Sequence, residues 1–118
     1  MANSEGIDPS AAPPATICLD CEAIDGWWLH LRRCAQCAHI GCCDNSPAQH
    51  ARLYFAETGH PIMQTFEPGE YWFWNYSTEK FLHGPALAEP TSRPEDQPAP
   101  GPRARVPDNW RSLLRSSS

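Results

Sequence analysis

The chain has 118 residues, a formal net charge of −5 and a pI of about 5.4. This length suits a single domain, and no stretch is long and apolar enough to span a membrane. An acidic chain lacks the basic surplus that nucleic-acid binding requires, so the composition disfavours a DNA- or RNA-binding role.

The composition divides the chain into a middle part and two tails. Residues 1–15 and 84–118 are rich in Pro, Ser, Ala and charged residues, so we predict two mostly disordered tails. In the second tail, Trp110 and Leu113 are spaced so that they could share one face of a short helix near residues 107–115. Residues 16–83 are the predicted folded domain, which is too short to bury a large apolar core without a metal or disulfide bonds.

Six cysteines offer a way to stabilise so short a domain. The N-terminus has neither the basic nor the apolar region of a secretory signal, so we expect a cytoplasmic protein with reduced thiols. Free thiols favour zinc, and the pairs Cys18-x2-Cys21 and Cys34-x2-Cys37 have the spacing that lets two sulfurs reach one ion. The spacing allows either one site made by both pairs or two interleaved sites that also use Cys42 and histidines.

Local signals predict strands and one clear helix. Residues 27–31 alternate large apolar side chains and indicate a strand, and residues 61–66 and 71–76 are also expected to be extended. Ser46 and Gln49 match a capping box and Gly59 suits a helix end, so we expect a helix over 47–58. The predicted fold is α+β: a small zinc-stabilised domain whose antiparallel sheet packs with one or two helices.

The order of these signals resembles a known family. The segments CLDC, WWLHLRRCAQCAHIGCCD, QHARLYFAETGHPI and YWFWNY are similar to the UBP-type zinc finger, the ubiquitin-binding module of some deubiquitinases, and most of all to its short bacterial members. The resemblance covers about residues 18–82. It implies an interaction module rather than an enzyme, and the sequence has neither a His-Glu-x-x-His motif nor a deaminase-type His-x-Glu motif.

The resemblance assigns zinc ligands. The family's common site falls on four residues that make a closed, structural arrangement: Cys18, Cys21, Cys42 and His50. A second site falls on Cys34, Cys37 and His60. Its fourth ligand, a histidine in the family, is Tyr54 here, and a neutral phenol is a poor zinc ligand. One Zn2+ is therefore expected, and a second requires another donor, for which His39 and Cys43 are the alternatives.

The resemblance also implies a groove that holds a free Gly-Gly C-terminus between aromatic side chains. The matching positions are Trp28, Trp74, Tyr76 and Glu79. The alternative is that these aromatic residues pack inside the core, because side chains on a strand alternate between its faces. The family's arginine is Asp44 here, and a carboxylate opposes a terminal carboxylate, so ubiquitin binding in the family's manner requires compensation by Arg32, Arg33 or Arg52.

We therefore expect a cytoplasmic zinc-binding module that recognises an unidentified protein or peptide C-terminus and binds neither membrane nor nucleic acid. Two other functions fit the cysteines. A redox or metal-responsive sensor would use Cys34, Cys37 and Cys43. A nucleic-acid-binding zinc ribbon would use both cysteine pairs, although the acidic middle part of the chain disfavours it.

Overall fold

The computed structural model describes residues 6–97 and 99–113 and contains a five-stranded antiparallel sheet. In spatial order the strands are β2 (Ile40–Cys42), β1 (Leu31–Cys34), β3 (Ile62–Thr65), β4 (Phe73–Asn75) and β5 (Lys80–Leu82). The helices are α1 (Leu19–Ala23) and α2 (His50–Thr58), with short 3-10 helices η1 (Arg103–Arg105) and η2 (Trp110–Leu113). The predicted α+β class is confirmed. No helix within the described residues is long and apolar enough to cross a membrane.

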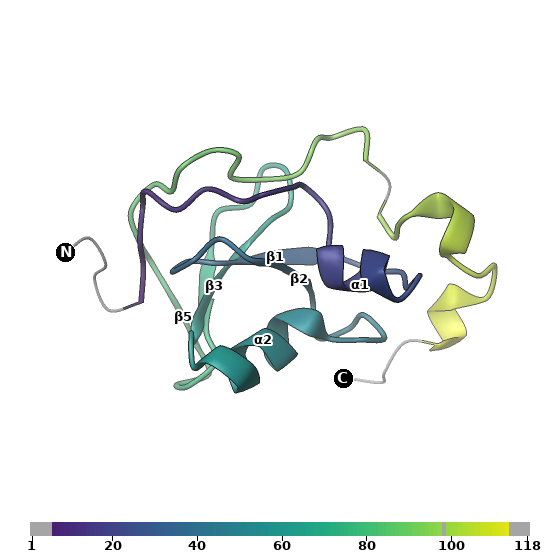
Figure 1. The fold of residues 1–118 in the computed structure, drawn as a ribbon, viewed down its shortest axis with the longest axis horizontal. Coiled ribbons are helices and arrows are strands. Elements are labelled where there is room, and N and C mark those ends of the chain that lie inside the picture. Colours follow the sequence, from purple (N-terminus) through teal and green to yellow (C-terminus); the bar gives the residue numbers. More distant parts are fainter. Residues whose placement is uncertain (1–5, 98, 114–118) are drawn as a thin grey trace.

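The two faces of the sheet are covered differently. Helix α2 packs on one face over β1 and β2, and the N-terminal segment and the segment after β5 run across the other side (Figure 1). Side chains of β1 alternate between these faces. Cys34 packs with residues of α2, whereas Arg33 reaches the two tail segments.

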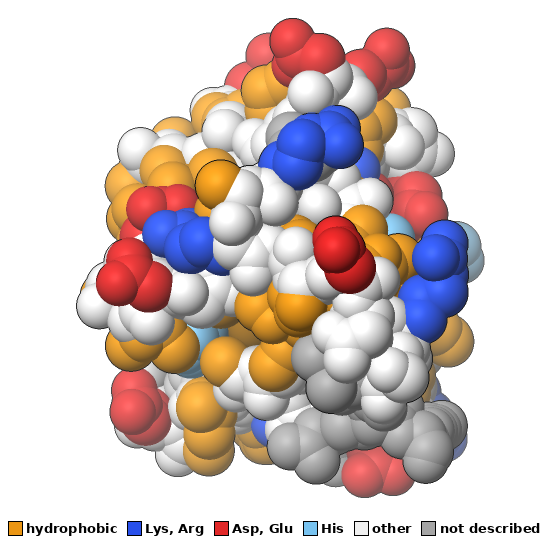
Figure 2. Space-filling view, turned by 90° about the vertical axis from the view of Figure 1, so that its right-hand side faces the viewer, with side chains coloured by type: hydrophobic (Ala, Val, Ile, Leu, Met, Phe, Trp, Pro, Cys, Tyr) orange, Lys and Arg blue, Asp and Glu red, His pale blue; other side chains and the backbone are white. Residues whose placement is uncertain are grey.

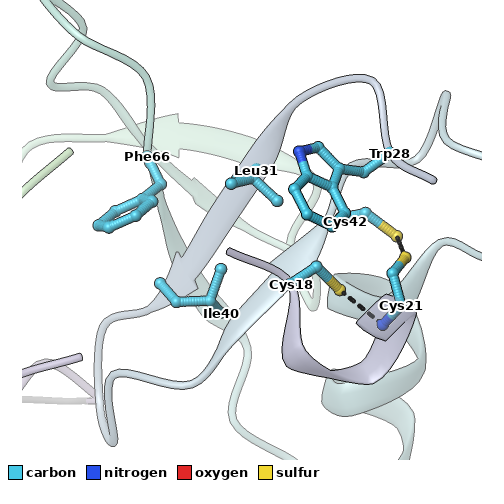
Figure 3. Packing of buried hydrophobic residues seen from close by; sticks show 7 residues of the cluster. All are labelled: Cys18, Cys21, Trp28, Leu31, Ile40, Cys42 and Phe66. Carbon is cyan, nitrogen blue, oxygen red and sulfur yellow. Dashed lines mark hydrogen bonds between the residues drawn. The ribbon is translucent and has the colours of Figure 1, made fainter. Parts of the chain in front are cut away.

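Three clusters of buried side chains form the core. The first surrounds sulfur atoms with large apolar groups and contains Cys18, Cys21, Trp28, Leu31, Ile40, Cys42 and Phe66 (Figure 3). The second contains Ile7, Ala35, Ile62, Phe73 and Leu87. The third contains Cys34, Met63 and Tyr76. Cysteine side chains are thus part of two clusters, and the first is built directly around three of the predicted zinc ligands.

A buried arginine ties both tails to the sheet. Arg33 is fully buried, and its guanidinium donates hydrogen bonds to the carbonyl oxygens of Ala11 (2.7 Å) and Ala88 (3.0 Å). Because a buried charge must be hydrogen-bonded to be tolerated, these carbonyls stabilise Arg33 and hold the two segments side by side.

The segment after β5 makes further contacts with the core. Gly101 pairs with the backbone of Trp28 through hydrogen bonds of 2.8 and 3.0 Å, and Arg93 forms an ion pair with Glu67 at 2.7 Å. The boundaries and the disorder expected for the tails stay predictions. Of the short helix expected near 107–115, residues 110–113 form η2, and residues 114 and 115 lie outside the described part, as do residues 1–5 of the first tail.

Two local predictions are corrected by the structure. The capping box does not form, because Ser46 accepts a hydrogen bond from the Leu29 amide (2.8 Å) and α2 begins only at His50, after Gln49 in a left-handed conformation (φ 53°). The strand expected over 27–31 is reduced to a single bridge between Trp28 and Gly101, and β1 begins at Leu31.

The physical reason for both differences is the packing around the cysteines. The loop before α2 has to bring the first residue of the helix next to the end of β2, and Trp28 turns inward to cover the same cluster. The predicted helix end is confirmed: Gly59 adopts φ 77° and its amide bonds to the Phe55 carbonyl.

Candidate metal centre

The first Cys/His cluster joins three elements of the fold. Its members come from the N-cap and body of α1, from β2 and from α2, and they are Cys18, Cys21, Cys42 and His50. The three cysteines are fully buried and the histidine is partly buried. These are the four residues that the resemblance assigned to one zinc. The alternative site made by both cysteine pairs does not form, because the second pair lies in a separate cluster.

The donor atoms of this cluster have the spacing of a tetrahedral zinc site. The sulfurs of Cys21 and Cys42 are 3.7 Å apart, and His50 Nδ1 lies 3.4, 3.3 and 3.5 Å from the sulfurs of Cys18, Cys21 and Cys42. Tetrahedral zinc, with bonds of about 2.3 Å to sulfur and about 2.0 Å to nitrogen, separates its ligand atoms by about 3.5–3.8 Å. The cluster therefore fits zinc closely, and four protein donors leave no position for a substrate.

Local backbone geometry brings these donors together. The Cys18 sulfur accepts a hydrogen bond from the Cys21 amide, and the Cys42 sulfur accepts one from the amide of His50, at the first turn of α2. Free amides at a helix start favour a negatively charged sulfur. Gly41 permits the approach, because a Cβ there would lie 2.6 Å from the Ala51 nitrogen.

The electrostatics of the cluster favour one thiolate and oppose three. Hydrogen bonds from the thiols of Cys18 and Cys21 lower the pKa of Cys42 to about 2, helped by the backbone amide and the ring of His50. Hydrogen bonds with Cys18 and Cys42, together with burial, raise the pKa of Cys21. Three neighbouring sulfurs repel one another as anions unless a cation lies between them, so this donor set calls for a divalent metal.

The second cluster offers three donors. Cys34 ends β1, Cys37 lies in the turn that follows, and His60 comes after α2. The Cys34 sulfur and His60 Nδ1 are 3.7 Å apart, and all three donor atoms lie within 4.8 Å of one another. These distances also suit one zinc ion. Unlike the cysteines of the first cluster, Cys37 is exposed.

The proposed replacements for a fourth ligand lie elsewhere. His39 points Nε2 at Asp20 Oδ2 (2.8 Å), and its ring stacks on Tyr54 at a centroid distance of 4.0 Å. Cys43 is buried with its sulfur 3.4 Å from Ser46 Oγ. Neither belongs to the second cluster as the structure describes it.

An aromatic groove of about 240 Å³ opens on the helix side of the sheet. Met63, Trp74 and Phe81 pair across β3, β4 and β5 and form its floor. The other lining residues are Arg32, Cys43, Asp44, Asn45, Trp72 and Tyr76. Two of the four residues predicted for a peptide groove, Trp74 and Tyr76, line it.

The other two predicted groove residues lie elsewhere. Trp28 is 1% exposed and packs in the first core cluster, because Gly101 covers its backbone and the cysteines surround its ring. The alternative of core packing is therefore the correct one for Trp28. Glu79 is exposed in the turn between β4 and β5 with φ 59°, and it does not line the groove.

Asp44 is held by two neighbours at the rim of the groove. Its carboxylate accepts hydrogen bonds from the Arg52 guanidinium (2.8 Å) and the Tyr76 hydroxyl (3.1 Å). Burial and the Asp44 charge raise the pKa of Tyr76, so the phenol remains a donor. Arg32, whose guanidinium lies 4.7 Å from the centre of the Trp72 ring, is a lining residue that the family pattern did not assign. The available signal was its charge, which made it one of three arginines considered as compensation for Asp44.

Comparisons with known proteins agree with this geometry. The family model for the zinc finger in ubiquitin hydrolases and other proteins matches residues 18–87. The solution NMR structure of protein RPA1320 from Rhodopseudomonas palustris is 40% identical to this chain, covers 77% of it and 85% of its own length, and superposes with a TM-score of 0.60. No curated protein matches the chain. Domains of the matched family bind zinc rather than catalyse a reaction, and both clusters here could hold an ion. The chain belongs to the UBP-type zinc finger family and is a zinc-binding module.

Proposed function

We propose that the chain is a non-catalytic interaction module that binds the free C-terminus of a protein or peptide in the aromatic groove. The observation that carries this proposal is the placement of one cation among aromatic walls: Arg32 lines the groove together with Trp72 and Trp74. Flat aromatic walls suit an extended backbone, and a guanidinium suits a terminal carboxylate.

The charge reversal at Asp44 is compatible with this proposal. Its carboxylate is paired with Arg52 at 2.8 Å and hydrogen-bonded to Tyr76, so much of its charge is already balanced. Within residues 6–97 and 99–113, Arg32 forms no ion pair with a carboxylate. One of its nitrogens donates to the Leu31 carbonyl (2.9 Å), and the charge of the guanidinium is left for a ligand. In this proposal Arg32, on β1, compensates for the family arginine that is missing from the turn after β2.

The metal has a structural part in this proposal. Cys43, Asp44 and Asn45 follow Cys42 directly and form one wall of the groove. A zinc ion that fixes Cys42 would therefore fix that wall, and the binding site would depend on the metal without contacting it. Zinc-binding thiols must be reduced, so the two Cys/His clusters suit a reducing compartment, and we propose the cytoplasm.

The surface charge supports a protein partner more than a nucleic acid. On the face seen in Figure 2, acidic and basic side chains are interspersed, with no continuous basic patch. A phosphate backbone requires such a patch to displace its counterions.

The test is a titration with peptides that end in Gly-Gly, either as free carboxylates or as amides, followed by tryptophan fluorescence. Trp72 and Trp74 line the groove, so binding should change their emission. The free carboxylate should bind at least about tenfold more tightly than the amide, because a charged hydrogen bond contributes about 1.5–3 kcal/mol. Arg32→Met should remove this preference, and Arg103→Met, an exposed arginine in η1, should retain it. Equal binding of both peptides, or no response to any C-terminus, contradicts the proposal.

The exposure of Cys37 favours a second candidate, a thiol-based sensor. In this reaction a peroxide oxidises Cys34 and Cys37 to a disulfide. The two sulfurs give up two electrons, and the peroxide takes up these electrons and two protons as its O–O bond breaks. Hydrogen peroxide gives two waters, an alkyl hydroperoxide gives an alcohol and a water, and the metal is released. Cys43, the third cysteine considered for such a role, is buried against Ser46. Release of one zinc per chain with a Cys34–Cys37 disulfide found by peptide mapping would support the sensor. The sensor proposal is wrong if the protein keeps both its metal and its thiols at peroxide concentrations that oxidise free cysteine.

A further inference from the structure

The second Cys/His cluster has a neighbour that holds one of its sulfurs. The Tyr54 hydroxyl is in direct contact with the sulfur of Cys37, and the two groups form a hydrogen-bonded pair in which either atom could be the donor. Two ligands of one tetrahedral zinc ion, a sulfur and an oxygen, would stand about 3.5 Å apart. Because the hydroxyl lies closer to the sulfur than a second ligand would, and because a neutral phenol is a poor zinc ligand, we place Tyr54 as a partner of Cys37 and not as the fourth ligand.

The orientation of Tyr54 is fixed from two sides. The His39 ring stacks on it at 4.0 Å and only 4° from parallel, and His39 is itself held by Asp20 at 2.8 Å. On the other side the ring of His60 meets it edge to face at 5.8 Å. These contacts keep the hydroxyl directed at the Cys37 sulfur and keep His39 away from the cluster.

The cluster is also open to small molecules. Cys37 is exposed, and His60 and Tyr54 are only partly buried. Among the described residues, no fourth cysteine, histidine or carboxylate joins these donors. A zinc ion with three protein ligands keeps a position for water or another small donor.

We propose that the second centre of this protein is a three-donor zinc site, formed by Cys34, Cys37 and His60, whose fourth position is filled by an exchangeable small ligand such as water, imidazole or a low-molecular-weight thiolate. Tyr54 is a positioning residue that donates a hydrogen bond to the Cys37 sulfur. This inference depends on the donor geometry of the second cluster and not on the peptide groove.

The proposal predicts how the second metal exchanges. Zinc should leave this centre at least about ten times faster than it leaves a version with a fourth protein ligand. Loss of a contact that only supports a ligand already costs about 10–100-fold in metal affinity, and loss of the ligand itself should cost no less. Tyr54→His supplies such a ligand from the same position on α2. The first cluster, with four protein donors, should not exchange on the same time scale.

The test uses the full chain loaded with Co2+ in place of zinc, whose visible spectrum reports its ligands. Cys37→Ser, which removes a donor of the second centre, provides the spectrum of the first centre alone. Subtracting this spectrum from that of the wild-type chain leaves the absorption of the second centre. Imidazole added to the wild-type chain should change that absorption, and native mass spectrometry should still find two metals per chain. Tyr54→Phe should respond in the same way, because it removes only the hydrogen bond, and Tyr54→His should not respond.

Three results would overturn the proposal. The first is a wild-type spectrum that does not change with imidazole although two metals are bound. The second is a tyrosinate absorption that appears on metal loading and is missing in Tyr54→Phe, which would make Tyr54 the fourth ligand. The third is a stoichiometry of one metal per chain at saturating Co2+ and at saturating zinc.

Discussion

The two Cys/His clusters use the same kinds of donor but differ in how deeply their side chains are buried. The first has four donors and three fully buried cysteines, and Trp28 and Leu31 pack against it. The second has three donors, and one of them, Cys37, is exposed. Burial therefore distinguishes a candidate site at the centre of the core from a candidate site that is accessible to solvent.

The connections of the two clusters differ as well. The first links α1, β2 and α2, which are elements of 5, 3 and 9 residues. Isolated helices of this length are marginal in water, so the metal and the packing around it hold them. The second links the end of β1 to the residue after Gly59, and β1 is already paired on both sides by β2 and β3. Loss of the second metal should accordingly cost less.

The largest effect is expected from Cys42→Ser. This change removes a donor of the first cluster, and structural zinc contributes about 10–16 kcal/mol, which is as much as the whole stability of a small domain. We expect no cooperative thermal transition by circular dichroism, and excess chelator should do the same to the wild-type chain. Cys43→Ser, a buried neighbour that is no donor, is the control and should melt cooperatively. If Cys42→Ser unfolded in a cooperative thermal transition like that of the wild-type chain, the first cluster would not be needed for folding, and the two clusters would not differ in this respect.

Gly41→Ala should have the next largest effect, without touching a ligand. The added Cβ would lie 2.6 Å from the Ala51 nitrogen and 2.8 Å from its Cα, and both are backbone atoms that cannot turn aside. We expect a loss of about 3 kcal/mol in the free energy of unfolding, at the upper end for overpacking, since β2 must separate from α2 and draw Cys42 away from His50. Urea titration with zinc present measures it. Gly59→Ala, where no atom lies within 4 Å but φ is 77°, should lose only about 1 kcal/mol. If both variants lost the same free energy of unfolding, the close approach of Gly41 to Ala51 would not be important for stability.

Glu67→Gln tests the packing that surrounds the first cluster. Glu67 is 5% exposed, accepts the Leu31 amide at 2.9 Å and pairs with Arg93. Burial opposes its charge, but hydrogen bonds from His30, Arg93 and Leu31 outweigh it and lower the pKa of Glu67 from 4.5 to about 2. We expect a loss of about 2 kcal/mol at pH 7, because glutamine can still accept from Leu31.

The sign of the pH dependence follows from that lowered pKa. A carboxyl group that is more acidic in the folded state stabilises the fold fully above pH 4.5, and the contribution disappears as pH falls toward 2. The difference in unfolding free energy between the wild-type chain and Glu67→Gln should therefore narrow below pH 4.5, as far as the zinc-loaded chain stays folded. A gap that stays constant through this range would mean that the charge of Glu67 contributes nothing.

The sequence predicted the ligand clusters better than the local elements that carry them. Spacing allowed two arrangements of the cysteines, and the resemblance chose the interleaved one, which brings together the same residues as the structure. Capping rules failed at Ser46 because its hydroxyl bonds to Leu29, a contact between residues far apart in the chain. Trp28 was assigned to the groove because the pattern cannot show that Gly101 covers it.

Contacts with the tails were the least predictable part. A Pro-rich composition indicates disorder, but composition does not reveal that Arg33 needs carbonyl partners and that Ala11 and Ala88 supply them. Arg32 is a similar case. Its place in the groove depends on the pairing of β1 with β3, and the expected strand over 27–31 ended one residue before it.

Cys37→Ser should have the smallest effect and is the sharpest test of the contrast. It removes a donor of the second cluster, yet Cys37 is exposed and lies outside all three core clusters. At free zinc a few times above the dissociation constant of this centre, bound metal stabilises the fold by only about 1 kcal/mol, so the loss should be of that size. Native mass spectrometry should find one zinc per chain, and the thermal transition should remain cooperative. Cys34→Ser, its fully buried partner, removes the same metal but also disturbs the packing with Met63, and should cost more. If both variants lost as much as Cys42→Ser, the second metal would be as structural as the first, and exposure would not distinguish the two sites.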